Sequence, residues 1–243
     1  MTTTSTTSLS PVLITGGCGL IDFHLVNHIL ESEPTCEIHV LDINTTRNRV
    51  LNVTYHTCDI TSLPGVESVM LQAQPRTIFH FACPDSMVLQ PSVFQKVNVN
   101  GAQNLISAAL KVGTAQAFVN TSTSSVIHDN ISDLIDADED LPDLQYSAQS
   151  VSTLLPTRPA TAFGERDTIC MGKIVDVCRQ GNRKFQIGAG KIEYDFIYVG
   201  NLSEAHILAA QALLCAFRKP VPPLETRVDG QTFNITNDER ILF

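Results

Sequence analysis

Short apolar runs alternate with stretches of helical periodicity from residue 11 to residue 125. Patterns typical of buried strands lie at residues 11–15, 37–42, 53–58, 77–81 and 117–122. Helical patterns lie between them, at residues 20–30, 65–74 and 93–112. Strand and helix in alternation predict right-handed βαβ units, and therefore a parallel sheet with helices on both faces. We expect an α/β, Rossmann-type, doubly wound fold.

The alternation stops after Ser125. Acidic residues gather between positions 129 and 143 without a clear period, which predicts an exposed acidic loop within an irregular segment, 126–157. Regular patterns then return as a helix at 169–180, strands around Phe185 and at 194–198, a helix at 202–217 and a strand at 233–236.

Composition narrows the classes of partner. The chain has 16 Lys and Arg against 25 Asp and Glu, a net charge of −9. This balance disfavours nucleic acid, because binding to phosphate backbones needs concentrated positive charge. No uncharged apolar run approaches the ~20 residues that a membrane-spanning helix needs. The seven cysteines are odd in number and form no Cys-x-x-Cys pair, which favours buried free thiols in a reducing compartment. The histidines lack metal-ligand spacing, so we expect no metal.

Glycines follow the first predicted strand and precede the first predicted helix, at Gly16, Gly17 and Gly19. Glycines there let the backbone approach a diphosphate, and the free amides at the start of a helix attract its charge. Asp42 ends the second predicted strand, where a carboxylate binds the adenosine ribose and favours NAD over NADP. Asp59 ends the third. Together these features predict a dinucleotide site; the alternative is turn glycines and surface acids in an α/β domain without a nucleotide.

Short motifs extend this pattern along the chain: Thr15–Gly19, Asp59–Ile60, Asn98–Gly101, Thr121–Val126, Arg158–Pro159 and Asp195–Asn201. They resemble the motifs of extended short-chain dehydrogenases, and most of all the 3β-hydroxysteroid dehydrogenase branch with its fungal sterol-4α-carboxylate 3-dehydrogenases (decarboxylating). The resemblance extends from residue 11 to residue 243.

The resemblance implies an activity and a set of site residues. In that family NAD takes a hydride from the sterol C3 carbon, and a 4-carboxylate beside the new ketone is lost as carbon dioxide. A Tyr whose pKa is lowered by a Lys four residues later acts as the base, and a Ser or Thr orients the substrate oxygen. By position, the resemblance implies Gly16, Gly17, Gly19, Leu20 and Ile21 at the diphosphate, Asp42 at the ribose, Asp59 and Ile60 at the adenine, Ala82 at the nicotinamide ribose, and Thr123 as the catalytic hydroxyl.

The sequence departs from the family in its base. No Tyr-x-x-x-Lys is present anywhere in the chain. Tyr146 has a tolerable spacing from Thr123, but the residue four positions later is Ser150, which cannot lower its pKa as an ammonium would. The link from Tyr146 to Arg158 is short, so we expect the Tyr/Lys helix and much of the next strand to be missing. Tyr146 is therefore either the base or a loop tyrosine.

A second departure lies in the glycine motif, whose third family glycine is Asp22 here. An Asp adds bulk where helix and strand pack closely. Its negative charge in the first helical turn would also compete with the diphosphate for the helix dipole. We expect weaker dinucleotide affinity than in relatives.

These observations predict a leader at 1–10 that is disordered, a NAD-binding domain at 11–160, and a small, truncated substrate lobe with returning sheet elements at 161–243. The favoured function is oxidation of the 3β-hydroxyl of a sterol, steroid or terpenoid in the cytoplasm, or in peripheral contact with the endoplasmic reticulum membrane where relatives work. Relatives also pair as homodimers. Three alternatives stay open. The first is a pseudoenzyme that binds a nucleotide or terpenoid, or a scaffold partner. The second is a truncated or misspliced gene product that folds poorly, and the third is a non-redox isomerase or lyase.

Overall fold

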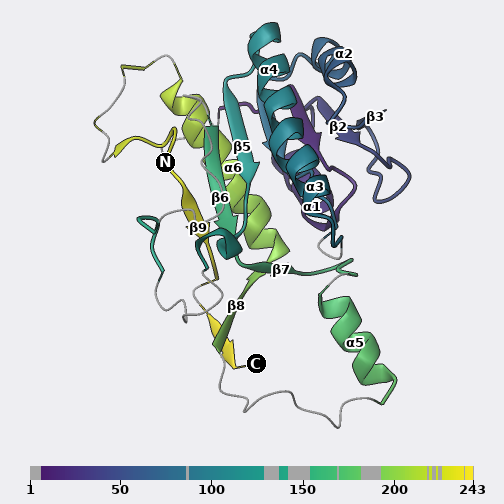
Figure 1. The fold of residues 1–243 in the computed structure, drawn as a ribbon. Coiled ribbons are helices and arrows are strands. Elements are labelled where there is room, and N and C mark those ends of the chain that lie inside the picture. The colour runs from purple at the N-terminus through teal and green to yellow at the C-terminus, as the bar shows by residue number, and fades with distance from the viewer. Residues whose placement is uncertain are drawn as a thin grey trace.

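The main sheet has seven strands, in the order β3-β2-β1-β4-β5-β6-β9, and every neighbouring pair is parallel (Figure 1). The computed structural model describes residues 7–85, 88–128, 137–141, 154–168, 170–181, 193–217, 219–220, 223, 226–237 and 239–242. The strands are β1 (Val12–Thr15), β2 (Ile38–Asp42), β3 (Thr54–Thr57), β4 (Thr77–His80), β5 (Ala117–Thr121), β6 (Leu154–Pro159) and β9 (Phe233–Ile235).

Helices cover both faces of this sheet, because the central strands are apolar on both sides. Every residue of β1 and β4 is buried. On one face α1 (Leu20–Ser32) packs against α6 (Val199–Ala216), and on the other α2 (Leu63–Ala73) packs against α4 (Ala102–Val112). Each face has its own apolar cluster. The predicted doubly wound α/β fold is confirmed.

The long helix predicted at 93–112 has three parts. It begins as α3 (Pro91–Phe94), continues as the π-helical segment η1 (Gln95–Gly101) and ends as α4. A Cβ at Gly101 would lie 2.6 Å from Cδ1 of Ile60. The absence of a side chain at this position therefore lets the helix pack directly on Ile60.

A second sheet of three strands lies beyond the carboxyl end of the main one, in the order β10-β8-β7 (Figure 1). Its strands are β7 (Thr161–Phe163), β8 (Glu193–Tyr198) and β10 (Arg240–Leu242). The helix α5 (Met171–Arg179) follows β7 and has no buried residue. No helix among the residues described here is long and apolar enough to cross a membrane.

Two expectations fail at particular segments. Strand β6 is six residues long, pairs with both β5 and β9, and begins at Leu154, so the strand is not lost and the irregular segment does not extend to 157. Prolines at positions 156 and 159 concealed it, since proline lacks the amide donor of a sheet ladder. The end of the predicted leader is also ordered, because Leu9 is 2% exposed within the core. The strand predicted around Phe185 lies outside the described residues.

The burial of β6 gives a test of its place in the core. Leu155→Ala removes a side chain that is 2% exposed, and we expect a loss of about 2–5 kcal/mol in the free energy of unfolding. Leu110→Ala, at a leucine that is 68% exposed on α4, is the control and should change it by less than about 0.5 kcal/mol. Urea denaturation measures both. Equal effects would contradict the buried strand.

Candidate dinucleotide site

The sheet has a switch point at β1. The chain leaves β1 for β2 on one side and later returns to β4 on the other. In open parallel sheets, ligands bind in the crevice at the carboxyl ends of the strands where the order reverses. The backbone continues the pairing beyond β1, because Gly16 N donates to Leu41 O at 2.9 Å and Phe81 N donates to Thr15 O at 3.0 Å.

The glycine loop after β1, residues Gly16–Gly19, leaves no room for a side chain at Gly16 or Gly17. Gly16 has φ +80°, and a Cβ there would lie 2.7 Å from the backbone N of Ala82. A Cβ at Gly17 would lie 2.5 Å from Cγ1 of Val40. The Gly16 carbonyl accepts from the amides of Cys18 at 2.8 Å and Gly19 at 3.2 Å. The loop therefore closes on itself directly before α1.

Helix α1 begins at Leu20, and its N-cap residue, Gly19, has no side chain with which to cap it. The amides of Leu20 and Ile21 belong to the first turn, which has no intrahelical acceptor. Free amides and the helix dipole at this end attract an anion. The residues predicted at the diphosphate thus form a tight glycine turn followed by the start of a helix, the arrangement that binds anions in proteins.

Asp42 lies beside this loop at the end of β2. Its Oδ2 accepts from the Cys18 amide at 3.2 Å, and its Oδ1 accepts from the Asn44 amide at 2.8 Å. Cys58 N donates to Asp42 O at 3.0 Å, which brings the end of β3 to the same edge. The carboxylate is therefore fixed in position, next to the loop, before any ribose binds.

Asp59 and Ile60 follow β3 on this edge. Asp59 Oδ1 accepts from the Thr61 amide at 2.8 Å. Ile60 is 4% exposed, and its carbonyl accepts from Asn104 Nδ2 at 3.0 Å. Ala82 follows β4 and is partly buried, with its backbone against Gly16. The structure thus brings the predicted loop, ribose, adenine and nicotinamide-side residues to one edge of the sheet.

The burial of Asp22 bears on the expectation that its negative charge competes with a diphosphate. The residue is 3% exposed, and burial raises the pKa of its carboxyl well above the usual range. The negative charge of Asp42 adds to this rise, and backbone amides of Asp22 and Gly19 oppose it. Its Oδ1 is buried with no hydrogen-bond partner among the described residues. Asp22 is thus driven toward the neutral acid, and competition with a diphosphate by charge is weakened.

Of the two predicted catalytic residues, the structure describes only Thr123. Thr123 is exposed after β5 and caps the short helix η2 (Ser124–Ile127), with its Oγ1 accepting from the Ser125 amide at 3.2 Å. Tyr146 lies outside the described residues. Both assignments therefore stay predictions.

Two buried histidines near the carboxyl ends of the strands are structural. His206 Nδ1 donates to Leu202 O at 2.7 Å, so Nε2 of the neutral ring accepts from Thr121 Oγ1 at 2.7 Å. Thr157 Oγ1 lies 3.2 Å from the same nitrogen. Burial lowers the pKa of His206 to about 4, and it lowers that of His80, which bonds Thr15 Oγ1 at 2.6 Å, to about 4 as well.

The cysteines are all free, but only Cys18 and Cys36 are buried, and three others are exposed. The expectation of buried thiols therefore holds for only part of the set. Burial raises the pKa of Cys18 to about 11, and the nearby charges of Asp42 and Asp22 add to the effect. A thiol with this pKa is a poor nucleophile at neutral pH, although it sits inside the glycine loop.

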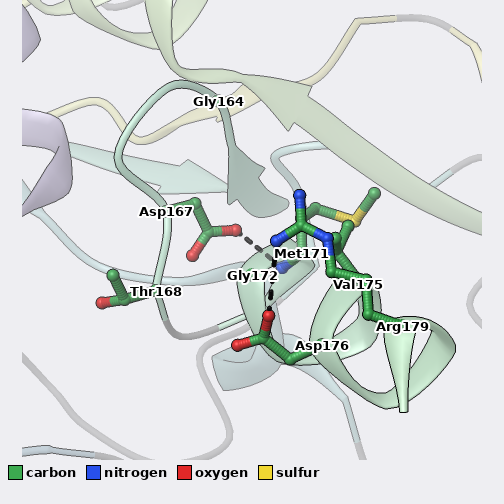
Figure 2. Close-up of a pocket in the computed structure, with 8 residues that line it drawn as sticks. All are labelled: Gly164, Asp167, Thr168, Met171, Gly172, Val175, Asp176 and Arg179. Atoms are coloured by element: carbon green, nitrogen blue, oxygen red, sulfur yellow. Dashed lines mark hydrogen bonds and ion pairs between the residues drawn. The ribbon is translucent and has the colours of Figure 1, made fainter.

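A cavity of about 390 Å³ opens between the turn after β7 and α5 (Figure 2). Asp167 caps the helix, with Oδ1 accepting from the Cys170 amide at 3.0 Å and Oδ2 from the Met171 amide at 2.7 Å. Met171 and Val175 contribute apolar side chains to its wall. The cavity is lined by Gly164, Asp167, Thr168, Met171, Gly172, Val175, Asp176 and Arg179. Sequence reasoning missed this cavity, because it depends on how the turn meets the helix.

Comparison with protein families gives a match over nearly the whole chain. A sequence model of the 3-beta hydroxysteroid dehydrogenase/isomerase family matches residues 13–154 and 150–241. The two matched parts meet where the Tyr/Lys helix is predicted to be missing.

Two fungal proteins are among the similar curated sequences. Sterol-4-alpha-carboxylate 3-dehydrogenase, decarboxylating, of Saccharomyces cerevisiae is 31% identical over 263 residues, which cover 97% of this chain and 73% of that protein. The Candida albicans enzyme of the same name is 32% identical over 265 residues, with coverage of 97% and 73%. Both alignments are longer than the 243 residues of this chain, so the relatives contain residues that it lacks.

Solved structures show the same fold. A UDP-glucose 4-epimerase of Thermus thermophilus, solved with NAD, has a TM-score of 0.71 at 21% identity and covers 96% of this chain and 79% of its own. The enzyme WbmG of Bordetella bronchiseptica, solved with NAD, has a TM-score of 0.73 at 20% identity, with coverage of 100% and 76%. At these identities the likeness establishes the architecture.

The buried Asp22 gives a prediction about stability and pH. Its folded pKa lies above the unfolded one, so the folded state holds the proton more tightly, and the contribution is lost as pH rises through the folded value. Asp22→Asn keeps the shape without this penalty. We expect the melting temperature of the variant to exceed that of the wild type at pH 8, on the order of 3 °C, and the gain to shrink toward pH 4.

Glu31→Gln, which changes an exposed carboxylate on the same helix, is the matched control and should show no such dependence. Thermal melts at several pH values measure all three proteins. A gain for Asp22→Asn that is constant across pH would contradict the buried acid.

Proposed function

Because the chain belongs to the 3-beta hydroxysteroid dehydrogenase/isomerase family, we propose that it is a NAD-dependent oxidoreductase that oxidises the 3β-hydroxyl of a sterol with loss of a C4 carboxylate. The observation that carries this proposal is the side-chain-free loop at Gly16 and Gly17 before α1, with Asp42 fixed beside it. The names of the fungal relatives support the substrate class.

The residues present fit a nicotinamide dinucleotide. Without side chains at Gly16 and Gly17, the backbone of the loop is open to a diphosphate. The first-turn amides of α1 follow directly after this loop. Gly16, Gly17, Gly19, Leu20 and Ile21 would hold the diphosphate. Asp59 and Ile60 would flank the adenine, and Ala82 would border the nicotinamide ribose. When bound, the nicotinamide accepts a hydride from the substrate carbon.

Asp42 favours NAD over NADP. Its two oxygens accept hydrogen bonds from the amides of Cys18 and Asn44, which hold the carboxylate beside the glycine loop, where the ribose would bind. A carboxylate accepts hydrogen bonds from ribose hydroxyls and repels a 2′-phosphate.

The second sheet and α5 offer a surface of the right chemistry for a sterol. Met171 and Val175 are 37% and 40% exposed and line the cavity beside α5. Ligand pockets for small molecules are mostly apolar with a few polar groups. Asp167, Asp176 and Arg179 are the charged groups on the same wall. We place the sterol rings against the apolar side of this cavity.

Oxidation needs a group that takes the hydroxyl proton while hydride leaves C3 for the nicotinamide. The new 3-ketone then accepts the electron pair released when the C4–carboxylate bond breaks, and the enolate is reprotonated at carbon. Thr123 would orient the substrate oxygen and Tyr146 would take the proton. Lys would ordinarily lower the pKa of such a Tyr, and none lies four residues after Tyr146.

This missing Lys favours one further candidate function, a protein that binds a dinucleotide or terpenoid without turnover. A non-redox isomerase or lyase, in which a cofactor is bound and not consumed, is the remaining alternative. Pairing of two copies and contact with the endoplasmic reticulum membrane, which family resemblance implies, remain predictions for this chain.

Turnover separates these candidates. The purified protein is incubated with NAD and a 3β-hydroxysteroid bearing a 4α-carboxylate, and reduced nicotinamide is followed by absorbance. If Thr123 and Tyr146 have the proposed roles, Thr123→Val and Tyr146→Phe each lower kcat by about 100-fold or more. Thr226→Val, which removes an exposed hydroxyl far along the chain, should leave kcat unchanged. Binding of NAD without reduction in the wild type would instead support the binding protein.

Cofactor choice tests Asp42 separately. We expect wild-type protein to bind NAD more tightly than NADP, because Asp42 repels the 2′-phosphate. Asp42→Ser should narrow that ratio by about tenfold, since one charge repulsion of about 1.4 kcal/mol is lost. Calorimetric titration with both cofactors measures the ratio, and an unchanged ratio would contradict the assignment.

A further inference from the structure

The turn that follows β7 carries an arginine in an unusual backbone conformation. Residues Gly164–Asp167 form a four-residue turn closed by a bond from Asp167 N to Gly164 O at 3.1 Å. Arg166, the third residue, has φ +72°, a left-handed conformation that favours glycine. A side chain retained at such a position is a reason to look for contacts that compensate the strain.

The Arg166 side chain leaves the second sheet and reaches the dinucleotide edge of the main one. Its guanidinium carbon lies 3.8 Å from the centroid of the Phe23 ring on α1. Its Nη1 donates to Oδ1 of Asn48 at 3.2 Å. Stacking and the hydrogen bond fix the plane of the guanidinium in the way that Arg, and not Lys, permits.

Asn48 connects Arg166 to the glycine loop by hydrogen bonds. Its Nδ2 donates to Cys18 O at 3.0 Å and to Gly19 O at 3.2 Å. Asn48 also has positive φ, +48°, so its backbone too adopts the left-handed conformation. One amide side chain therefore joins Arg166 to the two carbonyls that directly precede α1.

The same turn is fixed at two more points. His24 Nε2, on α1, donates to the Glu165 carbonyl at 2.9 Å. The Tyr198 hydroxyl, at the end of β8, donates to Oε2 of Glu165 at 2.9 Å. Gly164 and Asp167 from this turn also line the cavity beside α5 (Figure 2). The turn therefore touches both the cavity and the first helix of the dinucleotide site.

We propose that Arg166 is a positioning residue for the cofactor diphosphate, which acts through Asn48 to hold the Cys18 and Gly19 carbonyls and so keeps the first-turn amides of α1 open to the ligand. This inference rests on the proposed function, since it requires a dinucleotide at the glycine loop. Because the turn also borders the cavity, it couples the two: a ligand that displaces the turn changes dinucleotide affinity, and the reverse holds by linkage.

Binding measurements on three single variants and one double variant test the proposal. Arg166→Met keeps an aliphatic side chain and loses the guanidinium. Arg166→Lys keeps the positive charge without the planar guanidinium. Asn48→Asp keeps an acceptor for Arg166 and loses the donor to the two carbonyls. Affinities for NAD, for ADP-ribose and for adenosine are measured by calorimetry or by competition. ADP-ribose retains the diphosphate, and adenosine lacks it.

Arg166→Met and Asn48→Asp should each weaken NAD and ADP-ribose binding about tenfold and should change adenosine binding less than twofold. The double variant, which carries both Arg166→Met and Asn48→Asp, should bind NAD no more weakly than either single variant, because both changes break the same chain of contacts. The NAD affinity of Arg166→Lys should lie between that of Arg166→Met and that of the wild type. Lys111→Met, which removes an exposed positive charge on α4, is the control and should bind NAD as the wild type does.

Three outcomes overturn the proposal: unchanged NAD affinity in Arg166→Met, equal losses for NAD and adenosine, or additive losses in the double variant. If Arg166→Met does not fold, judged by thermal melting without nucleotide, Arg166→Lys and Asn48→Asp decide. A wild type that binds neither NAD nor ADP-ribose overturns the proposed cofactor and this inference together. A wild type that binds both, with variants that bind equally well, overturns only the role of Arg166.

Discussion

The contact between the backbone at Gly16 and the backbone at Ala82 determines the geometry of the dinucleotide edge. A single methyl group at position 16 would lie 2.7 Å from the Ala82 nitrogen and would force β1 and β4 apart. The strand order reverses between β1 and β4, which are hydrogen-bonded neighbours, and the helices that follow them lie on opposite faces of the sheet. The spacing of these two strands therefore sets the width of the crevice. The start of α1 and the position of Asp42 beside Cys18 both follow from the tight loop that this approach creates.

The two sheets meet around that loop. Strands β7, β8 and β10 pair only with one another among the described strands, and α5 buries none of its residues. The turn at Gly164–Asp167 nevertheless contacts α1 through His24 and the region after β2 through Asn48. Besides the packing of β7 and β8 against α6, the substrate-side and cofactor-side elements therefore share a few polar contacts at one turn. Such contacts are directional, so they transmit position more than they add stability.

Much of the fold could be predicted because β1, β2 and β4 are short apolar runs separated by helical periods, and the glycines mark the first turn. Strand β6 could not be predicted in this way, since Pro156 and Pro159 contradict an interior strand. The burial of Asp22 does have a signal in the sequence, because Asp22 shares the buried stripe of α1 with Leu25, Val26 and Ile29 at helical spacing.

The contact of Arg166 with Asn48 leaves no local signal at all, because 118 positions separate the two residues. The roles of Thr123 and Tyr146 depend on a segment between β5 and β6 in which sequence pattern is weak. The cavity beside α5 likewise arises from tertiary contacts, and the apolar stripe of that helix alone does not specify what faces it.

Two of the buried histidines, His80 and His206, make the stability of the sheet depend on pH in the acidic range. His206 joins β5 and β6 to α6, and His80 fastens the end of β4 to β1, each through a neutral ring whose pKa burial has lowered to about 4. A proton taken up by either ring must enter a site that is shielded from solvent, so unfolding is favoured as pH falls from about 6.5 toward 4. Asp22 has the opposite dependence, because burial raises the pKa of its carboxyl and its contribution to stability is lost as pH rises. Acid therefore acts on this fold through two imidazoles, and alkali through a single carboxyl.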